Sequence, residues 1–329
     1  MAEEVWLLLA AGSAIFAGLT SILAKCGLQN VDSTVATAYR TAVAMLFAWA
    51  IVIAAGSCSS IGDIGGETWL FLILSGLATG ASWLCYFKAL QMGNVNKVVP
   101  VDKSSNVLTI ILAVILLGET LSAWGCAGVA LILVGTMMMI ERKDVEEANE
   151  RAGWLLFAIG SAVFAALTSI LGKVGMQDID SNLGTAIRTV VVLAMSWTMI
   201  YVTKKQDKLR GIGRKDMLFV ILSGLATGAS WMCFFGALQI GPASIIVPID
   251  KLSILVAIAF SFLVFKERLS KKGAVGLAGI VAGTLLLLVR RKPTDGGLHP
   301  SVLEQGTWRE TLRERLKPAL RQGQDAQPV

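Results

Sequence analysis

The sequence predicts an all-α fold: a polytopic membrane protein of ten transmembrane helices, arranged as two inverted repeats of five helices. Three observations carry this prediction. The 329 residues are 55% hydrophobic and 16% charged, with a mean hydropathy of +0.68, whereas a soluble domain is about a quarter charged. The apolar residues form runs of membrane-spanning length. The two halves of the chain also align with each other without a gap.

Each apolar run has roughly the 20 residues that a helix needs to cross a hydrocarbon core of about 30 Å. The first half contains five runs, at residues 5–26, 33–55, 69–91, 96–117 and 121–140. The second half repeats them at residues 153–174, 181–203, 217–239, 243–265 and 273–289. Each half is therefore predicted to be one five-helix unit.

The first run follows Glu3 and Glu4 instead of the positive residues of a signal peptide, so we expect it to remain as a spanning helix. It ends near Lys25, and its counterpart in the second half ends near Lys173. We expect both lysines to extend their ammonium groups toward the membrane interface.

The repeat is close enough to indicate duplication. The segment SAIFAGLTSILAKCG at 13–27 matches SAVFAALTSILGKVG at 161–175, an offset of 161 − 13 = 148 residues, and SGLATGASW occurs at both 75–83 and 223–231. Because each unit has an odd number of helices, two fused units must lie in opposite orientations, as in many secondary transporters. The glycines of the SGLATG segments form GxxxG pairs, which permit close helix packing.

Loop charges agree with inversion. Residues 57–68 contain no Lys or Arg, whereas the equivalent loop at 204–215 is strongly basic. The positive-inside rule places the basic loop in the cytoplasm and both termini outside. The basic residues at 290–292 would then lie on the outer face and favour the reverse orientation, so the sequence leaves the orientation open.

These features divide the chain into four parts. The first repeat covers residues 1–140, a charged linker covers 141–152, the second repeat covers 153–291, and a polar C-terminal tail covers 292–329.

The fourth run of each repeat carries the segment VVPVDKSS (98–105) or IVPIDKLS (246–253). Ionisable residues within a spanning run are costly and are candidates for function, which singles out four positions: Asp102, Lys103, Asp250 and Lys251. Neighbouring residues on a helix do not face each other, so we expect each aspartate to have another partner.

The expected partners are arginines in the second run of each repeat. Arg40 is the candidate for Asp102, and Arg188 is the candidate for Asp250. A role in cargo binding or gating is one interpretation of the arginines. Structural pairing, or extension toward the interface, is the other.

Pro100 and Pro248 precede these aspartates by two residues. A proline inside a helix removes a backbone hydrogen bond and kinks the helix, and irregular backbone at membrane depth is tolerated where it lines a cavity. Alternatively, each proline lies in the first turn of its helix, where the aspartate is favourable near the positive N-terminus.

Trp83 and Trp231 occupy equivalent positions in the third run of each repeat. An indole ring could stack on a bound molecule, although tryptophans in spanning helices also serve packing and the interfacial belt.

Several function classes find no support in the sequence. The five cysteines form no CxxC pair and the single histidine lies in the tail, so we expect no disulfide framework and no metal site. No HExxH, GxSxG or Walker motif occurs, so we expect no catalytic residues, no cofactor and no enzyme. The basic residues lie in loops and at the ends of runs, so we expect no nucleic-acid partner.

The tandem five-helix units, the SGLATGASW third run, the proline early in the fourth run, and the segments GET (118–120) and KER (266–268) resemble the drug/metabolite transporter superfamily, EamA type. The resemblance implies four helices of each repeat around a central cavity, with the fifth helix peripheral. It also implies a multi-pass plasma-membrane protein with a small-molecule substrate and lipid neighbours, either a monomer or a homodimer. The small multidrug members carry a glutamate in the first helix, which residues 5–26 lack.

The charges point to a cargo class. In each repeat the candidate cations, such as Arg40 and Lys103, outnumber the single aspartate. We therefore expect a secondary transporter that moves a small polar metabolite, anionic or zwitterionic, by alternating access. Asp102 and Asp250 are the candidates for proton coupling, because a carboxylate in a low-dielectric site titrates at raised pH unless a cation holds it ionised. The alternative is a non-transporting membrane receptor or scaffold with structural charges.

Overall fold

The computed structural model describes residues 2–27, 31–92, 95–139, 153–210, 212–265 and 270–289. Within these ranges the chain forms twelve α-helices, two short 3-10 helices and no strand, so the all-α prediction is confirmed. The expected linker and C-terminal tail lie outside the described residues.

The first repeat begins with α1 (Ala2–Gly27), α2 (Ser33–Ala54) and the 3-10 helix η1 (Ser57–Asp63). The helices α3 (Gly66–Met92), α4 (Val95–Lys103), α5 (Ser105–Leu117) and α6 (Ala123–Met139) complete it.

The second repeat contains the same elements in the same order. It begins with α7 (Trp154–Gly175), α8 (Ser181–Val202) and the 3-10 helix η2 (Gln206–Leu209). The helices α9 (Arg214–Ile240), α10 (Ala243–Lys251), α11 (Ser253–Phe265) and α12 (Lys271–Val289) complete it.

The fourth run of each repeat is divided into two helices, immediately after the Asp-Lys pair. At the division the backbone tightens to i−3 hydrogen bonds: the amide of Ser104 donates to Val101 (3.2 Å) and the amide of Leu252 donates to Ile249 (2.9 Å). Pro248 lies inside α10, five residues after its start, so the first-turn interpretation is wrong for this proline. The interior proline removes one helical hydrogen bond, and the helix divides one turn later.

Among the described residues, eight helical stretches are long and apolar enough to cross a membrane. Two of the ten predicted spans fall short of that criterion in the described structure. The helix α6 has 17 residues, and the division leaves α4 with 9 residues and α5 with 13.

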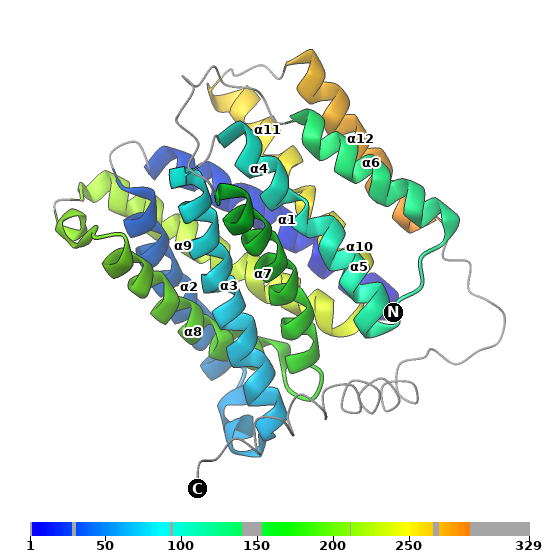
Figure 1. Cartoon of the computed structure of the whole chain (residues 1–329). Helices are drawn as coiled ribbons and strands as arrows, with labels where there is room; N and C mark the ends of the chain where they lie inside the picture. Colours follow the sequence, from blue (N-terminus) through cyan, green and yellow to red (C-terminus); the bar gives the residue numbers. More distant parts are fainter. Residues whose placement is uncertain are drawn as a thin grey trace, which may run out of the picture.

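The two repeats are interleaved and do not form separate bodies. The first helix of each repeat packs along the third helix of the other, α1 with α9 and α7 with α3 (Figure 1). Glycines allow close approach elsewhere in the bundle. A Cβ added to Gly76 would lie 2.7 Å from Val191, and one added to Gly224 would lie 2.6 Å from Val43. The predicted packing role of the GxxxG segments is confirmed.

The helices α6 and α12 pack on each other at one side of the bundle (Figure 1). A Cβ added to Gly135 would lie 2.5 Å from the carbonyl oxygen of Gly276, so this contact requires glycine. The fifth helix of each repeat is thus peripheral, as the resemblance implies.

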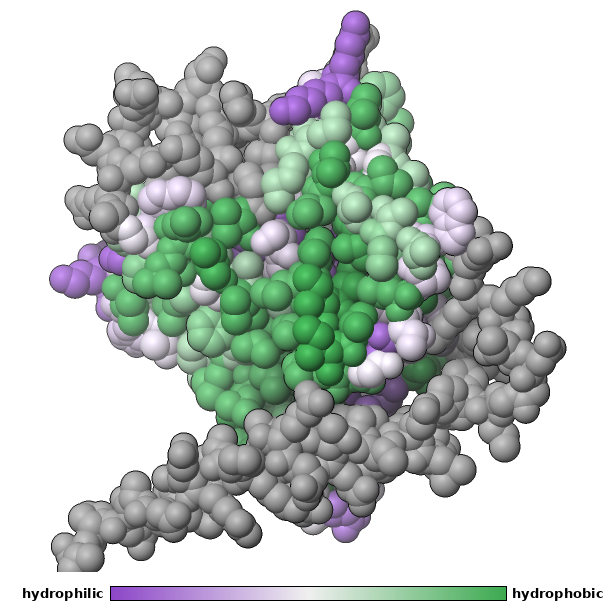
Figure 2. All heavy atoms as spheres, turned by 45° about the vertical axis from the view of Figure 1, so that its right-hand side comes forward, coloured by the Kyte–Doolittle hydropathy of each residue, from purple (hydrophilic) through white to green (hydrophobic). Residues whose placement is uncertain are grey.

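The outer surface of the bundle is apolar. Large hydrophobic side chains such as Leu8, Leu156 and Leu263 are exposed. Figure 2 shows a broad hydrophobic area on the face that it presents. An apolar area of this extent is typical of a surface that faces lipid.

Candidate functional site

The carboxylate of Asp250 joins the two repeats at the division of α10 and α11. Its Oδ1 atom accepts a 2.6 Å hydrogen bond from the hydroxyl of Ser13 on α1. The hydroxyl of Ser230 on α9 lies 3.4 Å from the Ser13 hydroxyl and donates to the Ser13 carbonyl at 3.2 Å. Three helices therefore meet around one intramembrane carboxylate.

Asp102 lies in the equivalent arrangement in the other repeat. Its Oδ1 atom accepts a 2.7 Å hydrogen bond from the hydroxyl of Ser161 on α7. The hydroxyl of Ser82 on α3 lies 3.3 Å from the Ser161 hydroxyl and donates to the Ser161 carbonyl at 3.0 Å. Sequence analysis did not identify these serines as partners of the aspartates. The available signal was that each serine occurs at the equivalent position of both repeats.

The neighbouring lysines contact the aspartates, so the expectation that adjacent residues would not pair is wrong. Lys103 Nζ lies 3.4 Å from Asp102 Oδ2, and Lys251 Nζ lies 3.4 Å from Asp250 Oδ2. The flexible four-carbon side chain of lysine allows it to fold back over one residue. The lysine side chains are 51% and 44% exposed, so these are loose ion pairs of small energetic weight.

Arg188 is 1% exposed and lies within the bundle without an acidic partner among the described residues. Its Nε donates to the hydroxyl of Ser75 at 3.3 Å and its Nη2 to the hydroxyl of Thr79 at 2.8 Å. Its Cζ atom lies 4.1 Å from the ring centre of Phe235 and 5.6 Å from that of Trp231. The expected pairing of Arg188 with Asp250 is wrong.

One guanidinium nitrogen of Arg188, Nη1, is buried with no hydrogen-bond partner among the described residues. The accepting hydroxyls are fixed by their own donations, from Ser75 to the Thr168 carbonyl (2.8 Å) and from Thr79 to the Ser75 carbonyl (3.0 Å). Their lone pairs are therefore directed at the guanidinium. Sequence analysis did not identify Ser75 and Thr79 as partners of Arg188. The available signal was that both residues lie in the duplicated SGLATG segment.

Arg40, the equivalent residue of the first repeat, is in a different state. Its side chain is partly accessible, whereas that of Arg188 is buried. The expected ion pair with Asp102 is not found in the described structure. The guanidinium of Arg188 lies over the ring of Trp231. Among the described side chains, the equivalent residues Arg40 and Trp83 make no such cation–π contact. The same residues thus occupy two different environments.

Glu119, which follows α5, binds the beginning of α10 in the other repeat. Its carboxylate accepts hydrogen bonds from the backbone amides of Ala243 (2.7 Å) and Ser244 (2.9 Å) and from Lys173 Nζ (3.0 Å). Lys173 also donates to the Gly241 carbonyl at 2.7 Å. The interaction is an N-cap supplied from elsewhere in the chain, because the N-cap residue of α10 has no capping side chain.

This environment changes the ionisation of Glu119. Burial alone would raise the pKa, but the Lys173 charge and the hydrogen bonds from Ser244 and Lys173 outweigh it and hold the pKa below the usual 4.5. That Lys173 lies near the interface stays a prediction; its ammonium group binds this carboxylate. The side chain of Lys25 lies outside the described residues.

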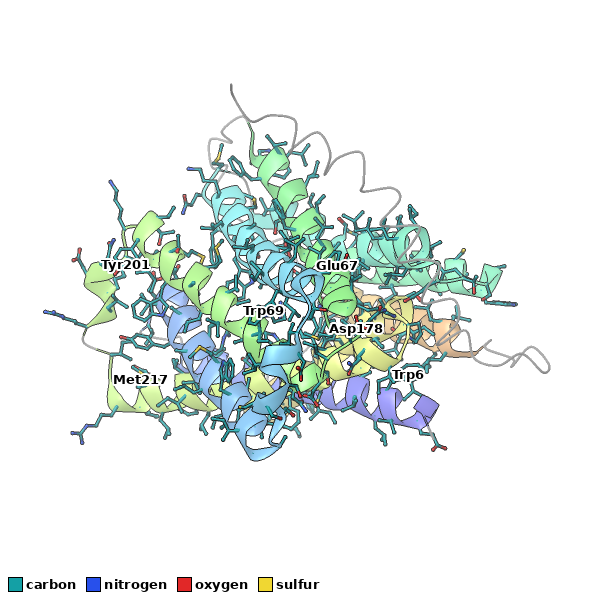
Figure 3. All side chains as sticks on the ribbon, turned by 90° about the horizontal axis from the view of Figure 1, so that it is seen from below. Trp6, Glu67, Trp69, Asp178, Tyr201 and Met217 are labelled. Atoms are coloured by element: carbon teal, nitrogen blue, oxygen red, sulfur yellow. The ribbon has the colours of Figure 1, made fainter. Side chains whose placement is uncertain are left out.

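A cleft of about 280 Å³ lies at the loops between η1 and α3 and between α7 and α8. Its acidic lining residues include Asp63, Glu67 and Asp178. Figure 3 shows Glu67 and Asp178 on the same end of the bundle. The described His, Cys, Asp and Glu residues form no group that could hold a metal ion.

These features define a class: a helical membrane protein built from two related repeats. A family model described as the EamA-like transporter family matches residues 4–141 and again residues 152–289. The chain belongs to the EamA-like transporter family. It is a multi-pass protein of the plasma membrane, and the family resemblance read from the sequence is confirmed.

Related proteins carry transporter names without an assigned substrate. An "Uncharacterized transporter in cobO 3'region" of Sinorhizobium sp is 46% identical over 136 residues, covering 41% of this chain and 96% of that protein. That whole relative therefore corresponds to one repeat. An "Uncharacterized transporter" of Archaeoglobus fulgidus is 23% identical over 289 residues, covering 86% of this chain and 98% of its own.

A solved crystal structure has the same fold. It superposes with a TM-score of 0.72 at 21% sequence identity, covering 86% of this chain and 97% of that chain. At this level of identity the likeness supports the fold alone.

Proposed function

We propose that the protein is a secondary transporter that moves a small anionic or zwitterionic metabolite by alternating access between two inverted repeats. The observation that carries the proposal is Arg188, a fully buried cation with no acidic partner among the described residues and with one unpartnered nitrogen.

A guanidinium within the membrane is costly unless an opposite charge accompanies it. The neighbours of Arg188 are two hydroxyls and two aromatic rings, which orient the cation but do not neutralise it. Arginine binds planar anions such as carboxylate and phosphate through paired N–H groups. An anionic group of the cargo is the charge that this site lacks.

Ten membrane crossings in two opposite units fit the helix lengths. The helices α4 and α5 have 9 + 13 = 22 residues, which span about 33 Å together at 1.5 Å per residue. The helix α6, with 17 residues, reaches about 26 Å, and tilt and local thinning accommodate such differences. Five crossings in each unit then require the units to be inverted.

Asp102 and Asp250 are the candidates for proton coupling. Each aspartate side chain is 15% exposed and accepts a hydrogen bond from a serine of the opposite repeat. Gain of a proton would weaken the contact with the neighbouring lysine and release that cation. Protonation would in this way change the charge balance at the contact between the repeats.

A thermal-shift panel on the purified protein tests the cargo class, with amino acids, organic acids, sugar phosphates and polyamines as ligands. A ligand at 100 times its Kd stabilises the native state by about 2.7 kcal/mol. We expect a carboxylate or phosphate to raise the melting temperature, and Arg188→Gln and Arg40→Gln each to reduce the shift. Lys88→Gln is the matched control, because Lys88 is exposed and has glycine at the equivalent position.

Three results would contradict the proposal. Equal shifts in the wild type and both monodisperse arginine variants would assign the arginines to structure alone. Stabilisation by polyamines only would reverse the sign of the cargo. A complete absence of shifts would favour a receptor or scaffold with structural charges.

A further inference from the structure

The loop between α8 and α9 is opposite in charge to the equivalent loop of the first repeat. Residues 204–216 contain six Lys and Arg and two Asp, a net charge of 6 − 2 = +4, whereas residues 56–68 contain two acidic residues and no Lys or Arg, a net charge of 0 − 2 = −2. Five of the six basic side chains are exposed, and we call them the basic loop surface: Lys204, Lys208, Arg210, Arg214 and Lys215. The positive-inside rule accounts for the sign of the loop but not for how its charges are held.

Lys204 occupies a backbone conformation that favours glycine. The helix α8 ends in a Schellman motif, in which the amide of Lys204 donates to the Tyr201 carbonyl (3.1 Å) and the amide of Lys205 donates to the Ile200 carbonyl (3.0 Å). Lys204 has a φ of +54° and is the only non-glycine residue with positive φ in the described part of the chain. The equivalent residue of the first repeat is Gly56, with a φ of +71°. A side chain is strained in this conformation, so the second repeat retains a cation where glycine would be more stable.

The sixth cation of the loop, Lys205, fixes the loop to the first repeat. Its Nζ atom lies 2.9 Å from Oδ1 of Asp32, which precedes α2. The hydroxyl of Tyr39 on α2 also donates to the Leu209 carbonyl at 3.3 Å. Apart from a 3.5 Å contact of Lys208 with the same aspartate, the basic loop surface has no carboxylate partner among the described residues. Its charges are therefore held in place by a neighbouring ion pair but are not neutralised themselves.

Apolar side chains adjoin the basic loop surface. Tyr201 and Val202, at the end of α8, are 60% and 65% exposed, and Leu218, in the second turn of α9, is 54% exposed. Figure 3 shows Tyr201 and Met217 on the same side of the bundle, flanking this loop. Both α8 and α9 are apolar and long enough to span a membrane. An exposed tyrosine at the end of such a helix is typical of the membrane interface, so the basic loop surface is expected at the depth of the lipid headgroups.

The beginning of α9 adds backbone donors to these charges. Its N-cap residue, Gly213, supplies no capping side chain. Its first turn contains Arg214 and Lys215 together with one acidic residue, Asp216. Cations are unfavourable at the positive end of a helix, whereas an anion there accepts hydrogen bonds from free amides and pairs with the cations. A phosphate group fits this combination of donors.

We propose that the basic loop surface binds the phosphate headgroup of an anionic phospholipid, whose acyl chains lie against the exposed apolar side chains of α8 and α9. Clusters of Lys and Arg next to a spanning helix attract anionic lipids. Because the loop is bonded to α2, the bound lipid contacts a surface that both repeats support. The proposal does not depend on the cargo or on the transport mechanism.

Lipid titration of the full-length protein in a neutral detergent tests the proposal. The probe is phosphatidylglycerol with a fluorescent acyl chain, and phosphatidylcholine with the same chain is the zwitterionic control. We expect tighter binding of phosphatidylglycerol, and about fivefold weaker binding for each cation removed in Lys204→Gly, Arg210→Gln and Arg214→Gln, the equivalent of about 1 kcal/mol per cation. The matched control is Lys271→Gln with Lys272→Gln, which removes two exposed cations at the start of α12 and should leave the affinity unchanged.

Lys204→Gly separates lipid binding from folding. Because glycine relieves the backbone strain, the lipid-free variant should melt at a higher temperature than the wild type while it binds phosphatidylglycerol more weakly. A lower melting temperature, or an unchanged affinity for phosphatidylglycerol, would contradict the proposal. Equal affinity for the two lipids, or an equal loss of affinity in the α12 variant, would overturn it. Displacement of the lipid by an equal concentration of free glycerol phosphate would show a site for soluble anions and would overturn it as well.

Discussion

The hydrogen bond between Arg188 and Thr79 can be tested against a closely matched control within the same chain. Thr79 and its equivalent Thr227 are each 8% exposed. Each donates to a serine carbonyl four residues earlier, at 3.0 Å and 2.7 Å. Each also approaches a threonine of the opposite repeat, at 3.3 Å and 3.4 Å. Only Thr79 accepts a hydrogen bond from a guanidinium in the described structure, at 2.8 Å.

Thr79→Val and Thr227→Val remove the same hydroxyl with little change of volume. Both variants lose the hydrogen bond from the threonine hydroxyl to the serine carbonyl four residues earlier. Thr79→Val also leaves a second nitrogen of Arg188 without a hydrogen-bond partner. A hydrogen bond to a charged group contributes about 1.5–3 kcal/mol. We therefore expect the free energy of unfolding of Thr79→Val to lie lower than that of Thr227→Val by about this amount.

Equilibrium unfolding in a single detergent measures this difference, with the Arg188→Met background completing a double-mutant cycle. In that background the two valine substitutions should become equivalent. Equal destabilisation by both substitutions in the wild-type background would refute the argument that the hydrogen bond from Arg188 to Thr79 stabilises the fold.

Three further outcomes are expected. In proteoliposomes, Asp102→Asn or Asp250→Asn should abolish pH-driven uptake while cargo exchange persists; uptake unchanged in both would exclude proton coupling through these groups. The pKa of Glu119 is lowered in the folded state. Its contribution to the free energy of unfolding is therefore complete at neutral pH and is lost as the pH falls below about 4.5. In that pH range the melting temperature of the wild type should decline more steeply than that of Glu119→Gln. Topology reporters fused after Ser60 and after Lys208 should report opposite sides of the membrane, and a shared side would contradict inversion.

The sequence predicts the fold well because its signals are local and repeated. Apolar length identifies the spanning helices, and the 148-residue offset identifies the repeats. The division of the fourth run was only partly predicted. Pro100 and Pro248 predict an irregularity in the helix. The sequence alone does not predict that the helix divides after the Asp-Lys pair, as it does in the structure.

The partners of the charged residues were less predictable, because they depend on contacts between repeats. Arg188 was expected to bind a carboxylate and instead donates to Ser75 and Thr79 on α3. For Lys173 the sequence did not predict the partner, Glu119, which lies 54 residues earlier in the chain. Helix periodicity gives the face on which a residue lies, but the helix opposite that face follows only from the interleaving of the two repeats.

The unequal state of identical residues could not be predicted at all. A duplicated sequence predicts symmetry, yet Arg40 and Arg188 differ in burial and in contacts. A protein with two inverted repeats can place only one half of its pathway in the closed arrangement at a time if it works by alternating access. The asymmetry is therefore the structural feature most relevant to the proposed mechanism.

Counterflow in proteoliposomes tests transport itself. Vesicles are loaded with an excess of the anionic ligand selected by the thermal-shift panel, and a tracer amount of the same labelled ligand is added outside. We expect the wild type to accumulate tracer transiently above its equilibrium level and Arg188→Gln to show little accumulation. Tracer uptake by the wild type that is no greater than that of protein-free liposomes would contradict the proposal that this chain is a secondary transporter of anionic metabolites.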